Sequence, residues 1–375
     1  MNAQNHPADL HTTAQSARHR GEVVTVVDVA RMAGVSKSTA ARVLSETGSA
    51  STTARAKVLA AAERLGYRPN ALARAMARGR TNTIAAVIPD VSSPFFSAVV
   101  RGVSDVARAA GCEVVISNTD NDPDVEDRAL DVLLQKRVDG IVIAPVLQPR
   151  SHAALAEVGA RLPVVLVDRA EQGEGTTGFP LVAVDHVQAS TLAVRHLLEW
   201  GHRRIAIVTE AADRVDQLLA RPDAPTRDLP PSSARLLGYL RELRDWGLSP
   251  QRDLIVGASF DADETAAAVG RALAAGLDAT AMYCTDSTLT LGAYRKLSQL
   301  GVALPDELSF VGFDEQDWTT LVRPAITVVD QPRSQLGEQA GRLLLDLIED
   351  HTQPAADAFL PAHLITRNST GRPRR

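Results

Sequence analysis

The stretch TVVDVARMAGVSKSTAARVLS, residues 25–45, contains two short helical patterns joined by a tight turn. Thr25 followed by Asp28 three residues later is a capping-box pattern, which predicts that a helix begins here. Gly34 suits the end of that helix because glycine adopts a positive φ without a Cβ clash. Ser36 can then cap a second helix that runs to about Ser45. Two short helices around a glycine-containing turn predict a helix-turn-helix.

A third short helix is expected after this pair. Ser51 can cap it, and Val58, Ala62 and Leu65 would share one face at helical spacing. Three helices this short must share one small core, for which the sequence offers Val26, Ala30, Ala33, Val35, Val43 and Leu44. The second helix would be left free to lie in a DNA major groove.

The charge of the chain is divided unevenly. Residues 25–80 carry ten Lys and Arg against three Asp and Glu, a net charge of +7, whereas the whole chain carries −5. This asymmetry is expected of a protein that meets phosphate with one end only. An ordinary solvated basic face is the alternative that charge alone leaves open.

Cysteine usage and hydropathy indicate a compartment. Cys112 and Cys284 are the only cysteines and have neither zinc-site nor disulfide-framework spacing, so we expect reduced thiols in a cytoplasmic protein. Residues 1–24 are polar and lack the apolar region of a signal peptide, so they are interpreted as a disordered extension. No apolar run is long enough to span a membrane, and no membrane partner is expected.

The two helical patterns carry a family resemblance when they are taken with RAKVLAAAERLGYRPNALARAMARG, residues 55–79. Together these stretches resemble the DNA-binding headpiece of the LacI/GalR family of bacterial transcription regulators. The likeness continues to about Thr370, since the following part resembles that family's effector-binding core. It implies a transcriptional regulator, most often a repressor, that binds a near-palindromic double-stranded operator as a homodimer, with a tetramer left open. A small effector, expected to be a sugar or related hydroxyl-rich metabolite, would set its affinity.

The resemblance also implies which headpiece residues contact DNA. The family positions that match Lys37, Ser38 and Arg42 face base edges, and Lys and Arg can reach guanine O6 and N7. Phosphate contacts, which position the protein without specifying sequence, are implied for Thr25, Ser36, Thr39 and Ser45. The family usually has Asn where Ser45 stands. A solvated helix surface is the alternative for any one of these residues.

A short segment after the headpiece is expected to be helical only with a partner. Pro69 disfavours helix at Arg68, and Asn70 can cap a short helix that is marginal alone. In the family this is the hinge helix, which pairs across the dimer, enters the minor groove and wedges an apolar side chain into the central base step. The implied minor-groove residues are Asn70, Leu72, Ala73 and Met76, with Met76 as the wedge. A plain linker helix is the alternative.

From Thr83 the pattern changes to short apolar runs rich in β-branched residues. The runs TIAAVIP, EVVISN, VDGIVIAP and PVVLVD are separated by helical segments that begin near Pro94, Pro123 and Ser151. Such alternation predicts a parallel sheet with helices on both faces. The theme repeats with LVAVD, RRIAIVT, LIVGAS, AMYCT and LSFVGFD, so two similar α/β halves are expected. No dinucleotide or P-loop glycine motif follows a strand.

In the family these halves form a two-lobed periplasmic-binding-protein-like core with two parallel Rossmann-like sheets and three crossovers between lobes. The resulting division is an extension (1–24), a headpiece (25–69), a hinge helix and linker (70–81), a first lobe (82–182 and 331–356), a second lobe (183–330 and 357–370) and a tail (371–375).

The effector should lie beyond the carboxyl ends of the strands, as in other open α/β sheets. Candidates there are Phe95, Phe96, Asp168, Arg169, Asp185, Arg235, Phe260, Thr285, Asp286 and Asp314. Carboxylates, arginines and aromatic faces suit a polyhydroxylated ligand. Alternatively, Asp185 and Asp286 only cap helices, and Arg235 and Asp314 are surface charges. His186, His196 and His202 lack metal-ligand spacing and are interpreted as structural, so neither a metal nor a cofactor is expected.

Three departures from the family concern the effector. Thr285 replaces the usual Asn, and DHVQAS (residues 185–190) replaces a common Asp-Asn-x-x-Gly-Ala, which brings the bulk of Gln188. The stretch 210–233 is well over ten residues longer than the usual loop and could roof the pocket. A DNA-binding regulator without small-molecule control therefore remains an alternative. A transport-type sugar-binding protein is opposed by the headpiece, and an enzyme by the lack of a nucleophile elbow, metal cluster or nucleotide loop.

Overall fold

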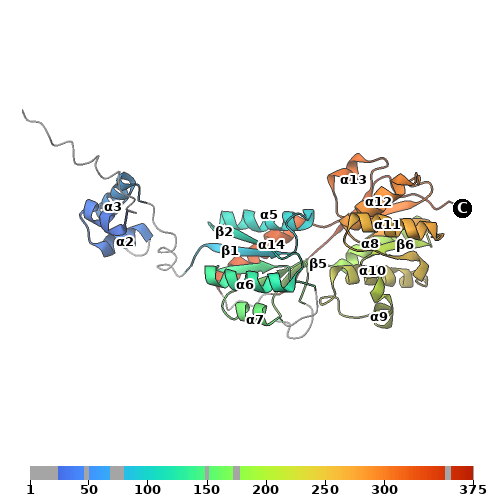
Figure 1. Ribbon diagram of the computed structural model, residues 1–375, viewed down its shortest axis with the longest axis horizontal. Helices are drawn as coiled ribbons and strands as arrows, with labels where there is room; N and C mark the ends of the chain where they lie inside the picture. The colour runs from blue at the N-terminus through green and yellow to red at the C-terminus, as the bar shows by residue number, and fades with distance from the viewer. Residues whose placement is uncertain are drawn as a thin grey trace, which may run out of the picture. The chain divides into compact units, whose positions relative to one another are not determined.

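The computed structural model describes residues 24–45, 50–67, 80–147, 152–171, 178–350 and 356–374. The chain divides into two compact units, Met1–Thr81 and Asn82–Arg375, at the point where the sequence predicts the linker to end (Figure 1). The predicted extension, through residue 23, lies outside the described residues. So does the predicted hinge, with its four candidates Asn70, Leu72, Ala73 and Met76.

The described part of the first unit consists of helices α1 (Val26–Ala33), α2 (Lys37–Ser45) and α3 (Thr52–Leu65). Both the backbone N–H and the hydroxyl of Thr25 donate to the Asp28 carboxylate, at 3.0 and 2.7 Å. Gly34 ends α1 with φ 66°. The Ser36 hydroxyl accepts from the Thr39 N–H at 3.1 Å, which caps α2. The helix-turn-helix and its capping residues are therefore confirmed.

The core of this unit differs in part from the expected set. Its buried residues are Val29, Ala30, Ala33, Ala40, Val43, Val58, Ala61 and Ala62. The predicted Val26, Val35 and Leu44 are only partly buried at its edge. Close packing of three short helices favours Ala and Val at the centre, and Val29, Ala40 and Val58 are the fully buried residues of this core.

The second unit contains two six-stranded sheets, each forming the centre of one lobe. In the first lobe the order is β11-β5-β4-β3-β1-β2, and neighbouring strands are parallel. These strands are β1 (Thr83–Ile88), β2 (Glu113–Asn118), β3 (Gly140–Ile143), β4 (Val164–Val167), β5 (Leu181–Val184) and β11 (Ala358–Leu360). The apolar runs of the sequence are therefore strands, and three of them are buried along their whole length.

In the second lobe the order is β12-β10-β9-β8-β6-β7, with β12 antiparallel to β10 and the other neighbouring pairs parallel. These strands are β6 (Ile205–Thr209), β7 (Ile255–Gly257), β8 (Ala281–Cys284), β9 (Ser309–Phe313), β10 (Thr327–Asp330) and β12 (His363–Ile365). The predicted α/β class with two Rossmann-like sheets is confirmed, apart from this antiparallel edge strand.

Helices cover both faces of each sheet (Figure 1). In the first lobe these are α5 (Pro94–Ala109), α6 (Pro123–Lys136), α7 (Ala153–Gly159) and α14 (Arg333–Glu349). In the second lobe they are α8 (His186–Glu199), α9 (Val215–Ala220), α10 (Pro231–Asp245), α11 (Ala262–Ala274), α12 (Ser287–Gln299) and α13 (Asp317–Leu321). Helices α5 and α14 touch through glycine, since a Cβ on Gly337 would lie 1.9 Å from the Val99 carbonyl oxygen.

Two of the three predicted lobe boundaries come too early. Strand β5 pairs with β4 and strand β11 pairs with β5, so both belong to the first lobe's sheet. The chain therefore crosses after Val184 and after Leu360, rather than at 182 and 356. Backbone pairing decides the place, because a residue hydrogen-bonded into the first lobe's sheet belongs to that lobe. The remaining crossing lies between β10 and α14, as expected.

The long stretch 210–233 is partly helical rather than a plain loop. It contains a 3₁₀ turn, η2 (Ala212–Arg214), and helix α9 before it reaches α10. Arg241 of α10 donates to the carbonyls of Pro222 and Ala224 at 2.7 and 3.2 Å, which holds the turn against the second lobe. Arg227 then reaches the first lobe, where it donates to the Asp357 carboxylate at 2.6 Å.

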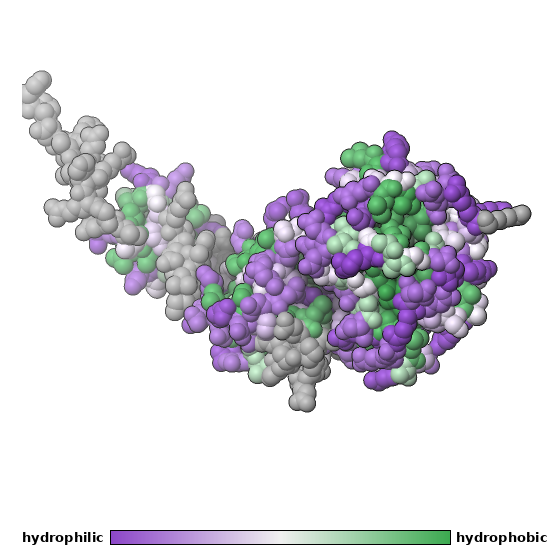
Figure 2. All heavy atoms as spheres, turned by 45° about the vertical axis from the view of Figure 1, so that its right-hand side comes forward, coloured by the Kyte–Doolittle hydropathy of each residue, from purple (hydrophilic) through white to green (hydrophobic). Residues whose placement is uncertain are grey.

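The surface seen in Figure 2 is mostly hydrophilic, with apolar patches between the charged side chains. Among the described residues, no helix is long and apolar enough to cross a membrane. Cys284 is buried and Cys112 is partly buried, and neither forms a disulfide within the described residues.

Candidate functional site

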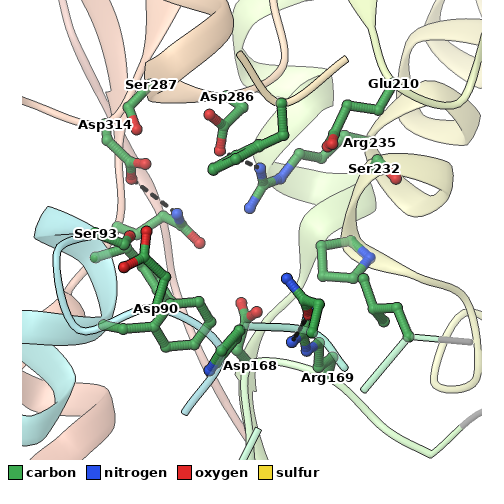
Figure 3. Close-up of a pocket in the computed structure, with 18 of the residues that line it drawn as sticks. Asp90, Ser93, Asp168, Arg169, Glu210, Ser232, Arg235, Asp286, Ser287 and Asp314 are labelled. Atoms are coloured by element: carbon green, nitrogen blue, oxygen red, sulfur yellow. Dashed lines mark hydrogen bonds and ion pairs between the residues drawn. The ribbon is translucent and has the colours of Figure 1, made fainter. Parts of the chain in front are cut away.

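A cavity of about 390 Å³ lies between the two lobes of the second unit. It is lined from the predicted set by Phe95, Phe96, Asp168, Arg169, Arg235, Phe260, Asp286 and Asp314. Figure 3 shows the labelled side chains of the two lobes facing one another across it. The carboxyl ends of the strands therefore gather eight of the ten candidates at one place.

Sequence reasoning missed other polar residues around the cavity. They include Asp90, Ser93, Asp120, Asn121, Glu210, Ser232, Ser287 and Gln331. Most of them stand one to three residues after a strand or beside a named candidate, so the same carboxyl-end rule could have found them. Glu210 and Ser232 lie near the two ends of the stretch 210–233, so this stretch lines the pocket at both ends.

Two predicted residues do not line the cavity. Thr285 is buried behind it, where its hydroxyl donates to the Val208 carbonyl at 3.2 Å. Asp185 caps α8 by accepting from the Gln188 N–H at 3.0 Å and faces a separate cavity of about 80 Å³. Asp286 combines both roles, because it caps α12 through the Thr288 N–H at 2.7 Å and also lines the main cavity.

Arg235 is held from three sides at the start of α10. Its guanidinium donates to the Thr285 carbonyl at 2.7 Å and to His186 Nδ1 at 3.3 Å. It also stacks over the Phe313 ring, 4.0 Å from the centroid. Its Nε is buried and has no hydrogen-bond partner among the described residues. A buried donor without a partner costs free energy, and this one belongs to a side chain that lines the cleft.

His186 links Arg235 to the first lobe. Its Nε2 lies 3.3 Å from the Asp168 carbonyl oxygen, and its Nδ1 accepts from Arg235. Burial, with a smaller effect from Arg235, lowers the pKa of His186 to about 3, so the ring is neutral at physiological pH. The two bonds place the ring proton on Nε2. The expectation of a structural histidine is met, although its contact with Arg235 could not be read from spacing.

The carboxylates of the cleft lie in a poorly solvated setting. Burial raises the pKa of Asp168 and of Asp314, and burial together with the Asp314 charge raises the pKa of Asp286 to about 7. Gln331 donates from Nε2 to the Asp314 carboxylate at 2.8 Å. Asp168 and Asp314 both adopt positive φ, 69° and 60°, where the backbone turns after β4 and β9.

The first lobe supplies the aromatic side of the cleft. Phe95 and Phe96 meet edge to face with centroids 5.0 Å apart at the start of α5. Arg169 stacks over Phe96 at 5.8 Å and donates to the Asn121 side-chain oxygen at 2.8 Å. Phe260, in the second lobe, is 51% exposed. Rings beside hydrogen-bonding groups are typical of pockets for ligands with both apolar and polar faces.

The first unit presents α2 to solvent. Lys37, Ser38 and Arg42 are exposed, and Arg42 Nε lies 3.4 Å from the Ser38 carbonyl oxygen. Of the predicted phosphate-contacting residues, Thr25, Ser36 and Thr39 are at least partly accessible. Ser45 is only 9% exposed and its hydroxyl donates to the Ala41 carbonyl at 2.8 Å. The predicted contact of Ser45 is therefore the least supported of the seven.

Comparisons with known proteins cover both units. Residues 25–70 match the model for bacterial regulatory proteins of the lacI family, and residues 81–368 match the model for periplasmic binding proteins and the sugar-binding domain of the LacI family. Two similar relatives are the catabolite control protein A of Priestia megaterium, 33% identical over 92% of this chain and 99% of that protein, and the transcriptional regulator GalR of Escherichia coli (strain K12), 31% identical over 94% and 97%.

Solved structures show the same arrangement of elements. The lac repressor dimer bound to operator and an anti-inducer superposes with a TM-score of 0.77 at 25% identity, covering 93% of this chain and 100% of that chain. A complex of the regulator CelR with cellobiose gives 0.65 at 27% identity, covering 92% and 99%. A helix-turn-helix unit followed by a two-lobed binding core defines a ligand-responsive class of DNA-binding transcriptional regulators. The chain belongs to the LacI family of bacterial regulatory proteins.

Proposed function

We propose that this protein is a cytoplasmic repressor that binds a near-palindromic operator as a homodimer and changes its operator affinity when a hydroxyl-rich effector, most simply a sugar, binds the cleft. The single observation that carries the effector part is the cleft itself. Arg235 and Asp314 of the second lobe face Asp168 and Arg169 of the first lobe around one cavity. A ligand held by both groups has a different affinity for open and closed lobes, which is the requirement for a switch.

The DNA part of the proposal rests on α2. Lys37, Ser38 and Arg42 are exposed on a helix whose N-terminus is capped by Ser36. Base contacts by these side chains would give specificity, and phosphate contacts by Thr25, Ser36 and Thr39 would set the register. We further propose that Asn70, Leu72, Ala73 and Met76 form the minor-groove hinge, a proposal that rests on the sequence alone.

A second candidate keeps DNA binding without small-molecule control. Thr285 favours it, because it replaces the family's amide and its side chain is turned away from the cleft toward Val208. Arg235 favours effector binding instead, because its charged side chain lines the cleft and contains a buried donor atom without a partner among the described residues. We propose no catalytic role, because the relatives found are regulators.

The proposal is tested by isolating genomic fragments that the full-length protein binds and measuring their affinity over a range of salt concentrations. Neutralising several phosphates makes the logarithm of the association constant fall steeply with the logarithm of salt. Arg42→Ala should lose about 1–3 kcal/mol on the selected site and relax its preference at one base pair per half-site. The matched control is Arg64→Ala, which removes the same charge from α3. An equal loss on selected and random DNA would show that Arg42 contacts only phosphate.

A further inference from the structure

The cleft carries an excess of negative side chains. Six carboxylates line it, namely Asp90, Asp120, Asp168, Glu210, Asp286 and Asp314. Only two cationic side chains, Arg169 and Arg235, stand among the described lining residues. Each lobe contributes three of the six carboxylates, so the negative side chains surround the cavity rather than lying on one wall (Figure 3).

The two arginines do not neutralise these carboxylates by direct hydrogen bonds. Arg235 bonds to a carbonyl and an imidazole, and its nearest lining carboxylate, Asp286, is 3.9 Å away. Arg169 bonds to an amide oxygen and stacks on Phe96. The strong donors of the cleft are therefore largely engaged by neutral groups, while the carboxylates keep acceptor oxygens directed at the cavity.

Glu210 is the clearest case. It stands at the first residue of the family-atypical insertion, 210–233, and forms no hydrogen bond or ion pair within the described part of the chain. Asp90 Oδ1 accepts from the Ser92 N–H and hydroxyl at 2.8 and 2.7 Å, and its Oδ2 forms no hydrogen bond within the described residues. Burial, with a smaller effect from Asp314, raises the pKa of Asp286 to about 7, so a bound cation would favour the ionised form of this carboxyl. Within the described residues no three of these groups converge in a metal-binding arrangement.

We propose that the cleft is specific for a hydroxyl-rich ligand that carries a protonated amino group, such as an amino sugar, and disfavours phosphorylated or acidic sugars. This inference rests on the proposed effector site and names its ligand class. Hydroxyls satisfy the acceptors and the apolar ring face packs on the aromatic side chains, as for a neutral sugar. Only a cationic ligand also offsets the excess of negative side chains. Each contact between its ammonium group and a carboxylate is a charge-assisted hydrogen bond, which is stronger in a partly dry site than in water.

The test uses sugars that differ only in charge. Purified full-length protein is titrated at neutral pH with D-glucose, D-glucosamine, N-acetyl-D-glucosamine and D-glucose 6-phosphate, and with the matching galactose and mannose series, by calorimetry and thermal shift. In at least one series the amino sugar should bind about tenfold or more tightly than its neutral and N-acetylated counterparts, and the phosphate should not bind detectably. The advantage of the amino sugar should shrink as salt is raised.

Variants separate charge from shape. Glu210→Gln keeps the size of the side chain and should reduce the advantage of the amino sugar several-fold with little change for the neutral sugar. Asp213→Asn, an exposed residue of the same insertion outside the cleft, is the matched control and should change neither. Equal or tighter binding of neutral sugars, or binding of a phosphate, would overturn the charge preference and leave the effector site standing. If no sugar of any charge binds, the effector site fails and this inference fails with it.

Discussion

Replacing Asp286 by asparagine should alter the pH dependence of stability in a way that tests the electrostatics of the cleft. Asp286 has a folded-state pKa of about 7, above the ordinary 3.8, because it is buried near Asp314. Between about pH 4 and pH 7, the folded protein therefore holds this proton while the unfolded chain has lost it. The contribution of Asp286 to the free energy of unfolding falls as pH rises through this range, and it becomes level above pH 7, once the group is ionised in both states.

The size of the effect follows from the same numbers. Each pH unit between 5 and 7 costs at most about 1.4 kcal/mol of unfolding free energy from this one group, or about 2.7 kcal/mol over both units. Sharing the proton with Asp314 and hydration of the cleft should reduce this to about 1–2 kcal/mol. Asparagine cannot ionise, and its side-chain oxygen can still accept from the Thr288 N–H and cap α12.

The assay is urea unfolding of wild type and Asp286→Asn at several pH values from 5 to 8, followed by circular dichroism. The stability difference in favour of the variant should widen by about 1–2 kcal/mol between pH 5 and pH 7 and then stay constant. Asp185→Asn is the matched control, since Asp185 also caps a helix but lies at the surface. Parallel curves for wild type and Asp286→Asn would refute the raised pKa of Asp286.

Three further predictions concern DNA, the insertion and the first lobe. Met76→Ala should weaken operator binding and reduce DNA bending in gel-shift assays while the free protein stays folded, and an unchanged bend would favour a plain linker. Arg227→Ala removes the partly buried ion pair with Asp357 between the insertion and the first lobe, so the free energy of unfolding should fall by about 1 kcal/mol. Arg227→Lys keeps the charge and should lose less. Equal losses for the two variants would show that packing alone matters. Gly337→Ala would place a Cβ 1.9 Å from the Val99 carbonyl oxygen, so it should lower the free energy of unfolding by about 1–3 kcal/mol or more. Gly341→Ala is the control and should have a smaller effect, because the nearest atom to its Cβ would be 3.4 Å away. Similar losses for the two variants in thermal melts would contradict this helix contact.

Local rules of the sequence were sufficient for the elements of the fold. Capping by Ser36 and positive φ at Gly34 involve only near neighbours, so they are visible in a linear pattern. Buried parallel strands show as apolar runs for the same reason. The boundary at 356 was misplaced because strand β11 pairs with β5, which is far away in sequence, and no local signal records that pairing.

The cleft was predictable in position but not in its internal contacts. The carboxyl-end rule gathers Asp168, Asp314 and their neighbours without any knowledge of side-chain direction. The rule cannot tell that Thr285 offers its carbonyl rather than its hydroxyl to Arg235, or that His186 completes the same contact. Such choices depend on rotamers and burial, which are set by packing of α8, α10 and the strands together.

The most direct test of the central claim is the operator dissociation constant measured with and without a saturating cleft ligand, for wild type and Arg235→Ala in parallel. The account predicts that ligand changes the wild-type constant by about 5–150-fold, which corresponds to a typical coupling between sites. Arg235→Ala should bind operator as the wild type does without ligand, because the headpiece has its own core, and should not respond to ligand. An operator affinity that no cleft ligand changes, or a variant that responds like the wild type, would contradict control of DNA binding through this cleft.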